Sequence, residues 1–367
     1  MRGKKLSKSR VLVVAPGDLT GLHTGDVEYA SNLNAMIGRQ VKSTLFCFEG
    51  HTATESRARF YLSLPKRLFA LTRQLLLTEG LVLVYNHHQI VVWSHFVRSI
   101  FRRRYYIMIY VPNTTLLVPG RPLIGRMYNS LVWSLGMAFS DAIGHDPSGV
   151  PAKLVGYSAI PVLSLPDVIV DTDDFAYSEV ARAKIRKSLE IEQDEMVVGM
   201  IGPFHGANLP SLKYLKQNLN LFRKDTHFVI IGDCPSNYRF MHSRVGFVGR
   251  VERLSDWLSA CDVILIPRLV DYGAPMGKMI HAMAVGLPVV TNNPEGMTVT
   301  SGVDAVVGSI DELPTLTSTL LEDPCRAKRI GANARHKIER EYSLKANEEK
   351  LVTFIAKYLN SEKDNAV

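Results

Sequence analysis

Short runs of apolar residues alternate, along the first half of the chain, with longer segments whose apolar residues recur every three or four positions. The short runs predict buried β-strands, and the longer segments predict amphipathic α-helices. The expected strands cover residues 10–15, 43–48, 81–85, 105–110 and 141–144. The expected helices cover residues 27–37, 64–77, 123–137 and a segment that ends at 101. This order predicts a parallel sheet with helices on both faces.

The alternation lapses in residues 159–175, which we interpret as a connector, and then resumes. The later strands are expected at residues 195–201, 227–231, 245–248, 263–266 and 287–290, and the closing helices at 313–321, 324–341 and 343–359. The predicted fold class is α/β, with two doubly wound, Rossmann-like domains that face each other across a cleft. We expect domains at residues 1–166 and 167–342, with the helix at about 343–360 packing back onto the first.

Composition indicates a globular protein without a spanning helix. The 367 residues are 46% hydrophobic and 21% charged, and no run of about 18 apolar residues occurs. The basic start of the chain is followed by an apolar run too short for a signal sequence. The cysteines are far apart and form no metal-ligand spacing; they are Cys47, Cys234, Cys261 and Cys325. We therefore expect a cytoplasmic protein.

Positive charge is concentrated in the first half. The whole chain has a net charge of +8, whereas residues 1–166 alone carry 19 basic and 8 acidic residues. Basic residues lie beside Leu, Phe and Tyr in two clusters, at residues 65–69 and 101–106. Such clusters suit an anionic membrane surface or a nucleic acid, and each one also suits a solvated basic face. The asymmetry of the whole half favours a membrane surface or an anionic acceptor.

Three loop regions of the second half contain glycine and basic residues after predicted strands. Gly202, His205 and Asn208 follow the first of these strands, and Asn208 is placed to cap the next helix. Gly232 follows the second strand, and Arg250 the third. Such loops are typical of a diphosphate cradle, although an ordinary capped turn fits the first loop equally well.

One short helix carries two further candidates for anion binding. Lys278 and His281 lie on the first turns of the helix within GKMIHAMAVGLPVV, where backbone N–H groups favour an anion. The standard signatures GxGxxG, GxxxxGK[ST], HExxH and GxSxG are missing from the chain. Their absence argues against the common dinucleotide, ATP, zinc-protease and hydrolase classes.

The segment VGFVGRVERLSDWLSACDVILIPRLVDYGAPMGKMIHAMAVGLPVV resembles the donor-binding half of nucleotide-sugar glycosyltransferases of family 4, which have the GT-B fold. HFVIIGDCP, EGMTVTSGVDAVV and the closing LLEDPCRAKRIGANARHKIEREYSLKANEEKL match the same family in order. The resemblance runs from about residue 167 to the end of the chain. The first half resembles the family more loosely, with Gly25 in the glycine position of its opening loop.

The resemblance implies a donor site in the second half and an acceptor site in the first. The donor is a nucleoside-diphosphate sugar, the reaction retains anomeric configuration, and neither a metal nor a cofactor is needed. Lys278 falls on a basic position that contacts the phosphates. The family places two glutamates where this chain has Gly273 and His281, so His281 takes the place of the ribose-binding glutamate. A histidine is capable of accepting one hydrogen bond there, or of adding positive charge when protonated.

Candidate catalytic residues lie in the first half. The family has a histidine after the fourth strand of its acceptor domain, where this chain instead has a strand containing Tyr110. His87 and His88 follow the preceding strand and are placed to substitute from the same edge of the sheet, although a structural role fits them too. We name His88 and Tyr110 as the catalytic candidates.

Two main functions follow from these observations. The first is a membrane-peripheral glycosyltransferase of polysaccharide biosynthesis that transfers a sugar from a nucleotide donor to a lipid-linked or polysaccharide acceptor at the cytoplasmic face. The second is a catalytically inactive GT-B-like subunit that acts in binding or scaffolding within a glycan-assembly complex, as the missing glutamates suggest. Nucleic-acid binding through the basic half is a third reading, without a recognised motif to support it.

Overall fold

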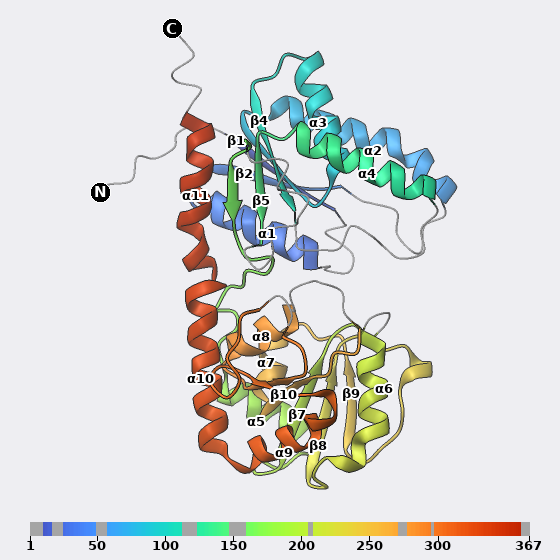
Figure 1. The fold of residues 1–367 in the computed structure, drawn as a ribbon, viewed down its shortest axis with the longest axis vertical. Coiled ribbons are helices and arrows are strands. Elements are labelled where there is room, and N and C mark those ends of the chain that lie inside the picture. The colour runs from blue at the N-terminus through green and yellow to red at the C-terminus, as the bar shows by residue number, and fades with distance from the viewer. Residues whose placement is uncertain are drawn as a thin grey trace, which may run out of the picture. The chain divides into compact units, whose positions relative to one another are not determined.

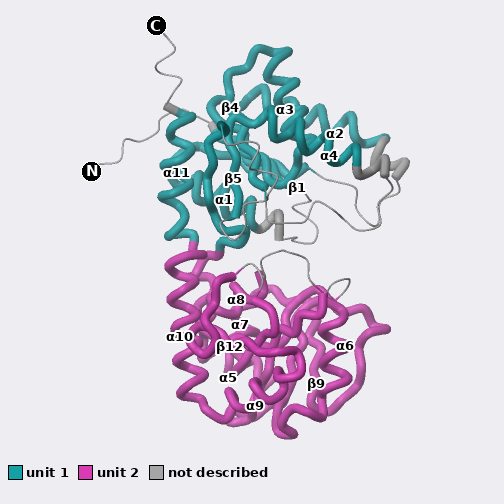
Figure 2. Tube along the Cα trace, in the orientation of Figure 1, with its two compact units in different colours: residues 1–169, 344–367 teal, residues 170–343 magenta. Residues whose placement is uncertain are grey.

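The computed structural model describes residues 10–16, 25–48, 57–111, 123–146, 159–204, 208–270, 277–294 and 297–360. The chain forms two compact units (Figure 2): unit 1 comprises residues 1–169 and 344–367, and unit 2 comprises residues 170–343. From the sequence, we expect these divisions at 166/167 and 342/343. Within the described ranges, no helix is both long and apolar enough to cross a membrane.

Unit 1 contains a sheet of six strands in the order β2-β1-β3-β4-β5-β6, and all neighbouring pairs are parallel. The strands are β1 (Arg10–Pro16), β2 (Lys42–Phe48), β3 (Gly80–Tyr85), β4 (Tyr105–Val111), β5 (Ala142–His145) and β6 (Val162–Ser164). The helices are α1 (Gly25–Gly38), α2 (Arg57–Leu77), α3 (His88–Ile100), α4 (Leu123–Ala138) and α11 (Leu344–Asn360).

Helices cover both faces of this sheet. Successive side chains of a strand point to opposite faces: Val11 and Val13 of β1 lie in a core with α1 and α11, whereas Leu12 and Val14 lie in a core with α2, α3 and α4. Figure 1 shows α2, α3 and α4 side by side over that second face. Burial on both faces is the reason why these strands are continuously apolar in sequence.

Unit 2 contains a second six-stranded parallel sheet, in the order β12-β11-β10-β7-β8-β9. The strands are β7 (Met196–Ile201), β8 (Thr226–Ile231), β9 (Val245–Gly249), β10 (Val263–Ile266), β11 (Val289–Thr291) and β12 (Val306–Val307). The helices are α5 (Glu179–Ser188), α6 (Leu209–Asn218), α7 (Leu254–Ser259), α8 (Gly277–Val285), α9 (Leu313–Glu322) and α10 (Pro324–Glu341).

The strand order of unit 2 reverses between β7 and β10. From β7 the chain continues to one side through β8 and β9, and it then crosses to the other side for β10, β11 and β12. Ligands of open parallel sheets bind outside the carboxyl ends of the strands at such a switch point. The chain leaves β7 toward α6 and leaves β10 toward α8, so the first turns of these two helices belong to the expected ligand site.

Some predicted element bounds were wrong. Helix α2 begins at Arg57 instead of 64 and contains Pro65, although proline is commonest in the first turn of a helix. Strand β6 lies in the segment interpreted as a connector. It was not predicted because its three residues are too few to show a pattern in the sequence. Strand β11 begins at Val289 instead of 287, because the intervening Pro288 has no N–H group to donate to a neighbouring strand.

Candidate functional site

Asn208 and Lys278 are joined at the switch point of unit 2. Lys278 lies in the first turn of α8, and its ammonium donates a hydrogen bond of 2.5 Å to Oδ1 of Asn208, immediately before α6. Nδ2 of Asn208 donates at 3.0 Å to the carbonyl of Pro203. The bond between the two side chains lies where the N-terminal ends of two helices meet, and backbone N–H groups at such ends favour an anion.

The predicted side-chain cap by Asn208 was wrong. Asn208 precedes α6, but its side chain makes no capping hydrogen bond and its backbone is helical. A capping side chain has to turn back to the N–H groups of the next turn from an extended backbone. In this protein, the amide is instead used by Lys278 and Pro203.

The ammonium of Lys278 lies in a region of positive potential. Burial and, secondly, the nearby positive charge of Arg268 lower the pKa of Lys278 from its ordinary value of 10.5 to about 8. Two cations beside two helix N-termini favour a ligand that carries more than one negative charge. A diphosphate has that property.

Arg268 was not identified from the sequence, and its backbone is tightly fixed. Its N–H donates at 2.7 Å to Oδ1 of Asn292, and Nδ2 of Asn292 donates at 2.8 Å to the carbonyl of Arg268. Thr291 donates its hydroxyl at 2.8 Å to the carbonyl of Ile266. The segment after β10 is therefore held by the end of β11. A basic residue shortly after a buried strand was the signal in the sequence.

Gly202 and Gly232 bring the ends of β7 and β8 into direct backbone contact. Gly232 has φ +127°, and a Cβ placed on it would lie 2.1 Å from the carbonyl oxygen of Gly202. Its N–H donates at 2.8 Å to the carbonyl of Gly249, while the N–H of Gly202 donates at 3.0 Å to Ile231. Only glycine fits at 232. Exposed Arg250 follows Gly249 at the end of β9.

His281 lies one turn after Lys278 on α8 and stacks on Phe175. The two rings are nearly parallel, with centroids 4.7 Å apart and an angle of 7° between their planes. Arg335 of α10 fixes this arrangement, because its guanidinium donates to the carbonyls of Phe175 at 2.9 Å and of Thr172 at 2.8 Å, and also to Ala284. One face of the His281 ring is thus covered by protein, and the ring has a defined orientation.

Two predicted ligand contacts stay predictions. His205 lies outside the described residues. Gly25 is the first residue of α1 in unit 1, whereas Gly202, Asn208, Gly232, Arg250, Lys278 and His281 all belong to unit 2. Among these, the structure brings Asn208 and Lys278 into contact and places Gly202 near both. The ideal Cβ position of Gly202 is 3.7 Å from the amide of Asn208 and 3.8 Å from the ammonium of Lys278.

His88 packs between helices instead of facing solvent. It is 7% exposed, its ring lies 5.7 Å from that of Trp133, and a Cβ on Gly136 would lie 2.8 Å from its own Cβ. Burial and, secondly, the charge of His87 lower the pKa of His88 to about 4. Burial gives His87 a similar pKa, and its ring packs edge-on against Phe48. A base of such low pKa accepts protons poorly near neutral pH, so this environment favours a packing role.

Tyr110 is fully buried in the core of unit 1. Its hydroxyl lies 2.7 Å from the carbonyl of Leu165 and 3.0 Å from Oδ1 of Asp167, and burial raises its pKa well above its ordinary value. Its ring stacks on Tyr85, with centroids 5.4 Å apart. These contacts tie β4 to the segment after β6. Both catalytic candidates stay predictions, and the packing of each favours a structural role.

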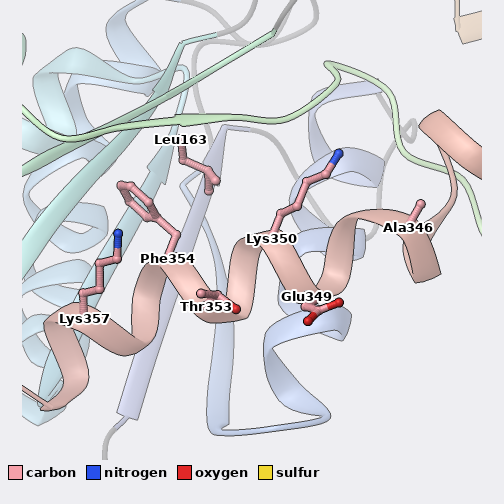
Figure 3. Close-up of a pocket in the computed structure, with 7 residues that line it drawn as sticks. All are labelled: Leu163, Ala346, Glu349, Lys350, Thr353, Phe354 and Lys357. Carbon is pink, nitrogen blue, oxygen red and sulfur yellow. The ribbon is translucent and has the colours of Figure 1, made fainter.

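A shallow groove beside α11 in unit 1 has no acid–base or nucleophilic cluster. It measures about 370 Å³ and is lined by Leu163, Ala346, Glu349, Lys350, Thr353, Phe354 and Lys357. Figure 3 shows Leu163 of β6 beside Phe354 of α11, with Lys350 and Lys357 on either side along the helix. None of the predicted site residues lies there.

Comparison with known proteins identifies the family to which much of unit 2 is similar. Residues 195–323 match a protein-family model described as Glycosyl transferases group 1. This range contains Gly202, Asn208, Gly232, Arg268, Lys278 and His281.

A curated relative supports the same conclusion. The GDP-mannose-dependent monoacylated alpha-(1-6)-phosphatidylinositol monomannoside mannosyltransferase of Corynebacterium glutamicum is 30% identical over 150 residues. The match covers 36% of this chain and only 39% of that relative. Both the family description and the name of this relative are those of transferases.

Solved structures match nearly the whole chain. The Anabaena protein HepE, in complex with UDP and glucose, has a TM-score of 0.71 at 14% identity, covering 95% of this chain and all of that one. Sucrose-phosphate synthase from Thermosynechococcus elongatus also has a TM-score of 0.71, at 15% identity, covering 96% and 100%. These likenesses confirm the predicted GT-B fold, with two parallel sheets flanked by helices.

Proposed function

We propose that this protein is a glycosyltransferase that takes a sugar from a nucleoside-diphosphate donor bound at the switch point of unit 2. The observation that carries the proposal is the contact between Lys278 and Asn208, which joins two helix N-termini beside Arg268. The two similar proteins named for nucleotide donors support it: the mannosyltransferase is GDP-mannose-dependent, and HepE is in complex with UDP.

The chemistry required of this site is stabilisation of the leaving group. As the bond between sugar and diphosphate breaks, negative charge builds on the diphosphate oxygen. The Lys278 ammonium, the Arg268 guanidinium and the N–H groups that open α6 and α8 offer fixed positive potential to that oxygen. We propose that His281, held by Phe175, contacts the nucleotide ribose. The positive charge comes from the protein itself, so we propose a metal-independent reaction with no cofactor. Retention of anomeric configuration is proposed from the resemblance to family 4 glycosyltransferases alone.

The acceptor is proposed to be a lipid-linked or polysaccharide glycan at the cytoplasmic face of a membrane. The relative from Corynebacterium is named for a phosphatidylinositol monomannoside acceptor, and the basic first half of the chain suits an anionic partner.

Among the described residues, no group of three or more His, Cys, Asp and Glu side chains is arranged to hold a metal ion.

A catalytically inactive binding subunit is the second candidate. It is favoured by His281, because one face of its ring is covered by Phe175. A histidine also lacks the carboxylate that would accept hydrogen bonds from two ribose hydroxyls.

Calorimetry of the purified chain against UDP, GDP and ADP tests the proposal first. The nucleotide that binds is then supplied as its sugar conjugates, and release of free nucleotide is followed with and without EDTA. Saturable binding with slow turnover that survives EDTA is the expected result. Binding without turnover of any conjugate favours the inactive subunit, and no binding of any nucleotide overturns the donor site.

A further inference from the structure

Helices α2, α3 and α4 have no acidic residue. They cover residues 57–77, 88–100 and 123–138 and include basic residues at several positions. Helices of globular proteins usually carry Asp or Glu in the first turn and on the solvent face. An acidic residue in the first turn interacts favourably with the helix dipole, and one on the solvent face pairs with Lys or Arg one turn away. Arg98 of α3 is paired with Asp141, and the exposed cations among the described residues of this side of unit 1 are Lys66, Arg73, Arg102 and Arg104.

Helix α2 is apolar on its solvent side as well as its buried side. Leu71 and Leu75 are fully buried against the sheet. On the opposite side, Leu62 is 82% exposed and Phe69 is 72% exposed, and Leu77 continues the same stripe. Exposed Lys66 and Arg73 stand between them at the three- and four-residue spacing of one helix face. Contact between water and exposed leucine and phenylalanine side chains is unfavourable, and such side chains gathered on one face mark an interaction surface.

The apolar surface continues over the neighbouring helices. Trp93 of α3 donates at 3.0 Å to the hydroxyl of Thr72 in α2, and Arg103 donates at 3.4 Å to the carbonyl of Thr78. The outer face of α2–α4, as we call this surface, has these exposed apolar residues: Leu62, Phe69, Leu77, Phe96, Ile100, Phe101, Met127, Tyr128 and Leu131. Figure 1 shows the three helices adjacent to one another.

The second sequence cluster, residues 101–106, contributes only in part to this face. Phe101, Arg102 and Arg104 are exposed. Tyr105 points into the core and donates its hydroxyl at 2.7 Å to the carbonyl of Ser94, so this tyrosine of the cluster does not belong to the exposed face. The break occurs because residue 105 begins strand β4, whose side chains are buried.

We propose that the outer face of α2–α4 docks on the surface of an anionic lipid bilayer. Leucine, isoleucine, phenylalanine and methionine side chains enter the interfacial region, while Lys66, Arg73, Arg102 and Arg104 contact lipid phosphates. A second copy of the chain fits poorly, because two basic faces repel each other. Nucleic acid leaves the exposed aliphatic side chains without a partner. This docking is separate from the nucleotide site, which lies in unit 2.

Flotation of the full chain with vesicles tests the proposal. The vesicles are made of phosphatidylcholine with or without phosphatidylglycerol. One variant, Phe69→Ser/Ile100→Ser, removes apolar contacts, and another, Lys66→Glu/Arg102→Glu, reverses charge. Val180→Ser/Met241→Ser and Lys328→Glu/Arg329→Glu are matched controls, since they change exposed residues of unit 2 in the same ways. Nucleotide binding by each variant, measured by calorimetry, checks that unit 2 is intact.

The expected result is binding to the anionic vesicles that both unit 1 variants weaken by at least about tenfold, with the controls unchanged. Loss in the charge variant alone would overturn docking through apolar contacts. Failure of the wild-type chain to float with anionic vesicles would overturn the proposal outright. Both outcomes leave the donor site untouched, because nucleotide binding is measured separately. If the face binds an acidic protein instead, the wild-type chain fails to float in the same way.

Discussion

Asn208 accepts a hydrogen bond of 2.5 Å from the ammonium of Lys278, although 70 positions separate the two residues in sequence. The contact exists because β7 and β10 are neighbours in the sheet, so the chain segments that follow them meet. Asn208 thus fixes the position of a cation that would otherwise sample many rotamers. A preorganised cation stabilises developing charge more effectively than a mobile one.

Lys278→Ala is expected to weaken nucleoside-diphosphate binding by roughly 10- to 100-fold, the usual effect of losing a hydrogen bond to a charged group. Asn208→Ala is expected to weaken it less, because the cation remains but is no longer held. In the double variant, the loss should equal that of Lys278→Ala alone, since Asn208 acts through Lys278. Calorimetry measures all three, with Lys213→Ala, an exposed lysine of α6, as the control. Additive losses would contradict the positioning role.

Nucleotide affinity is expected to fall as pH rises through about 8, the pKa of Lys278 in the unliganded protein. An anion favours the charged ammonium, so binding near this pH takes up protons. Calorimetry in two buffers of different ionisation enthalpy measures that uptake, which should vanish in Lys278→Ala. For folding, the sign is opposite. The unfolded chain holds this proton up to its ordinary pKa of 10.5, so the contribution of Lys278 to the free energy of unfolding rises between pH 8 and 10.5.

Gly232→Ala is expected to destabilise unit 2 by about 2–4 kcal/mol, because the new Cβ requires both a strained φ and movement of the Gly202 carbonyl. Gly246→Ala is the matched control: this glycine lies in β9, has no heavy atom within 4 Å of its ideal Cβ, and has no positive φ. Urea denaturation of both variants, followed by Trp257 fluorescence, gives the comparison. Equal stability of the two variants would show that the backbone contact is dispensable.

The fold was largely predictable from the sequence, whereas the contacts of the site were not. Strands such as β3 are buried on both faces and are apolar throughout, so their short continuous apolar runs reveal them in the sequence. Lys278 was identified from its place at a helix N-terminus and from a family resemblance, but its partner Asn208 was interpreted as a helix cap. Local sequence around Asn208 is compatible with capping, and only the order of strands in the sheet brings Lys278 to it.

The orientation of single side chains could not be predicted from the sequence either. His88 follows a strand at the edge where ligands bind, but it is the first residue of α3 and its ring turns toward Trp133 of α4. Arg268 was overlooked because a single basic residue shortly after a buried strand is too weak a signal on its own. Its importance depends on Asn292, which holds its backbone from the next strand. Long-range contacts of this kind require the assembled sheet.

Arg102→Gly is expected to stabilise unit 1 by about 1 kcal/mol and to weaken its binding to anionic vesicles. Arg102 has φ +49°, and the N–H of Arg103 donates to the carbonyl of Arg98, an arrangement of helix ends in which glycine is preferred. The substitution removes this strain together with one positive charge of the outer face of α2–α4.

Glu190→Gly is the matched control for this prediction. Glu190 has φ +56° at the corresponding position after α5, where the N–H of Ile191 donates to the carbonyl of Arg186. It should stabilise unit 2 by a similar amount, about 1 kcal/mol, and leave vesicle binding unchanged. Urea denaturation measures stability through Trp93 and Trp133 in unit 1 and Trp257 in unit 2, and flotation measures binding. If Arg102→Gly raises stability without weakening flotation, Arg102 is not part of the membrane contact, and its positive charge has no role in vesicle binding.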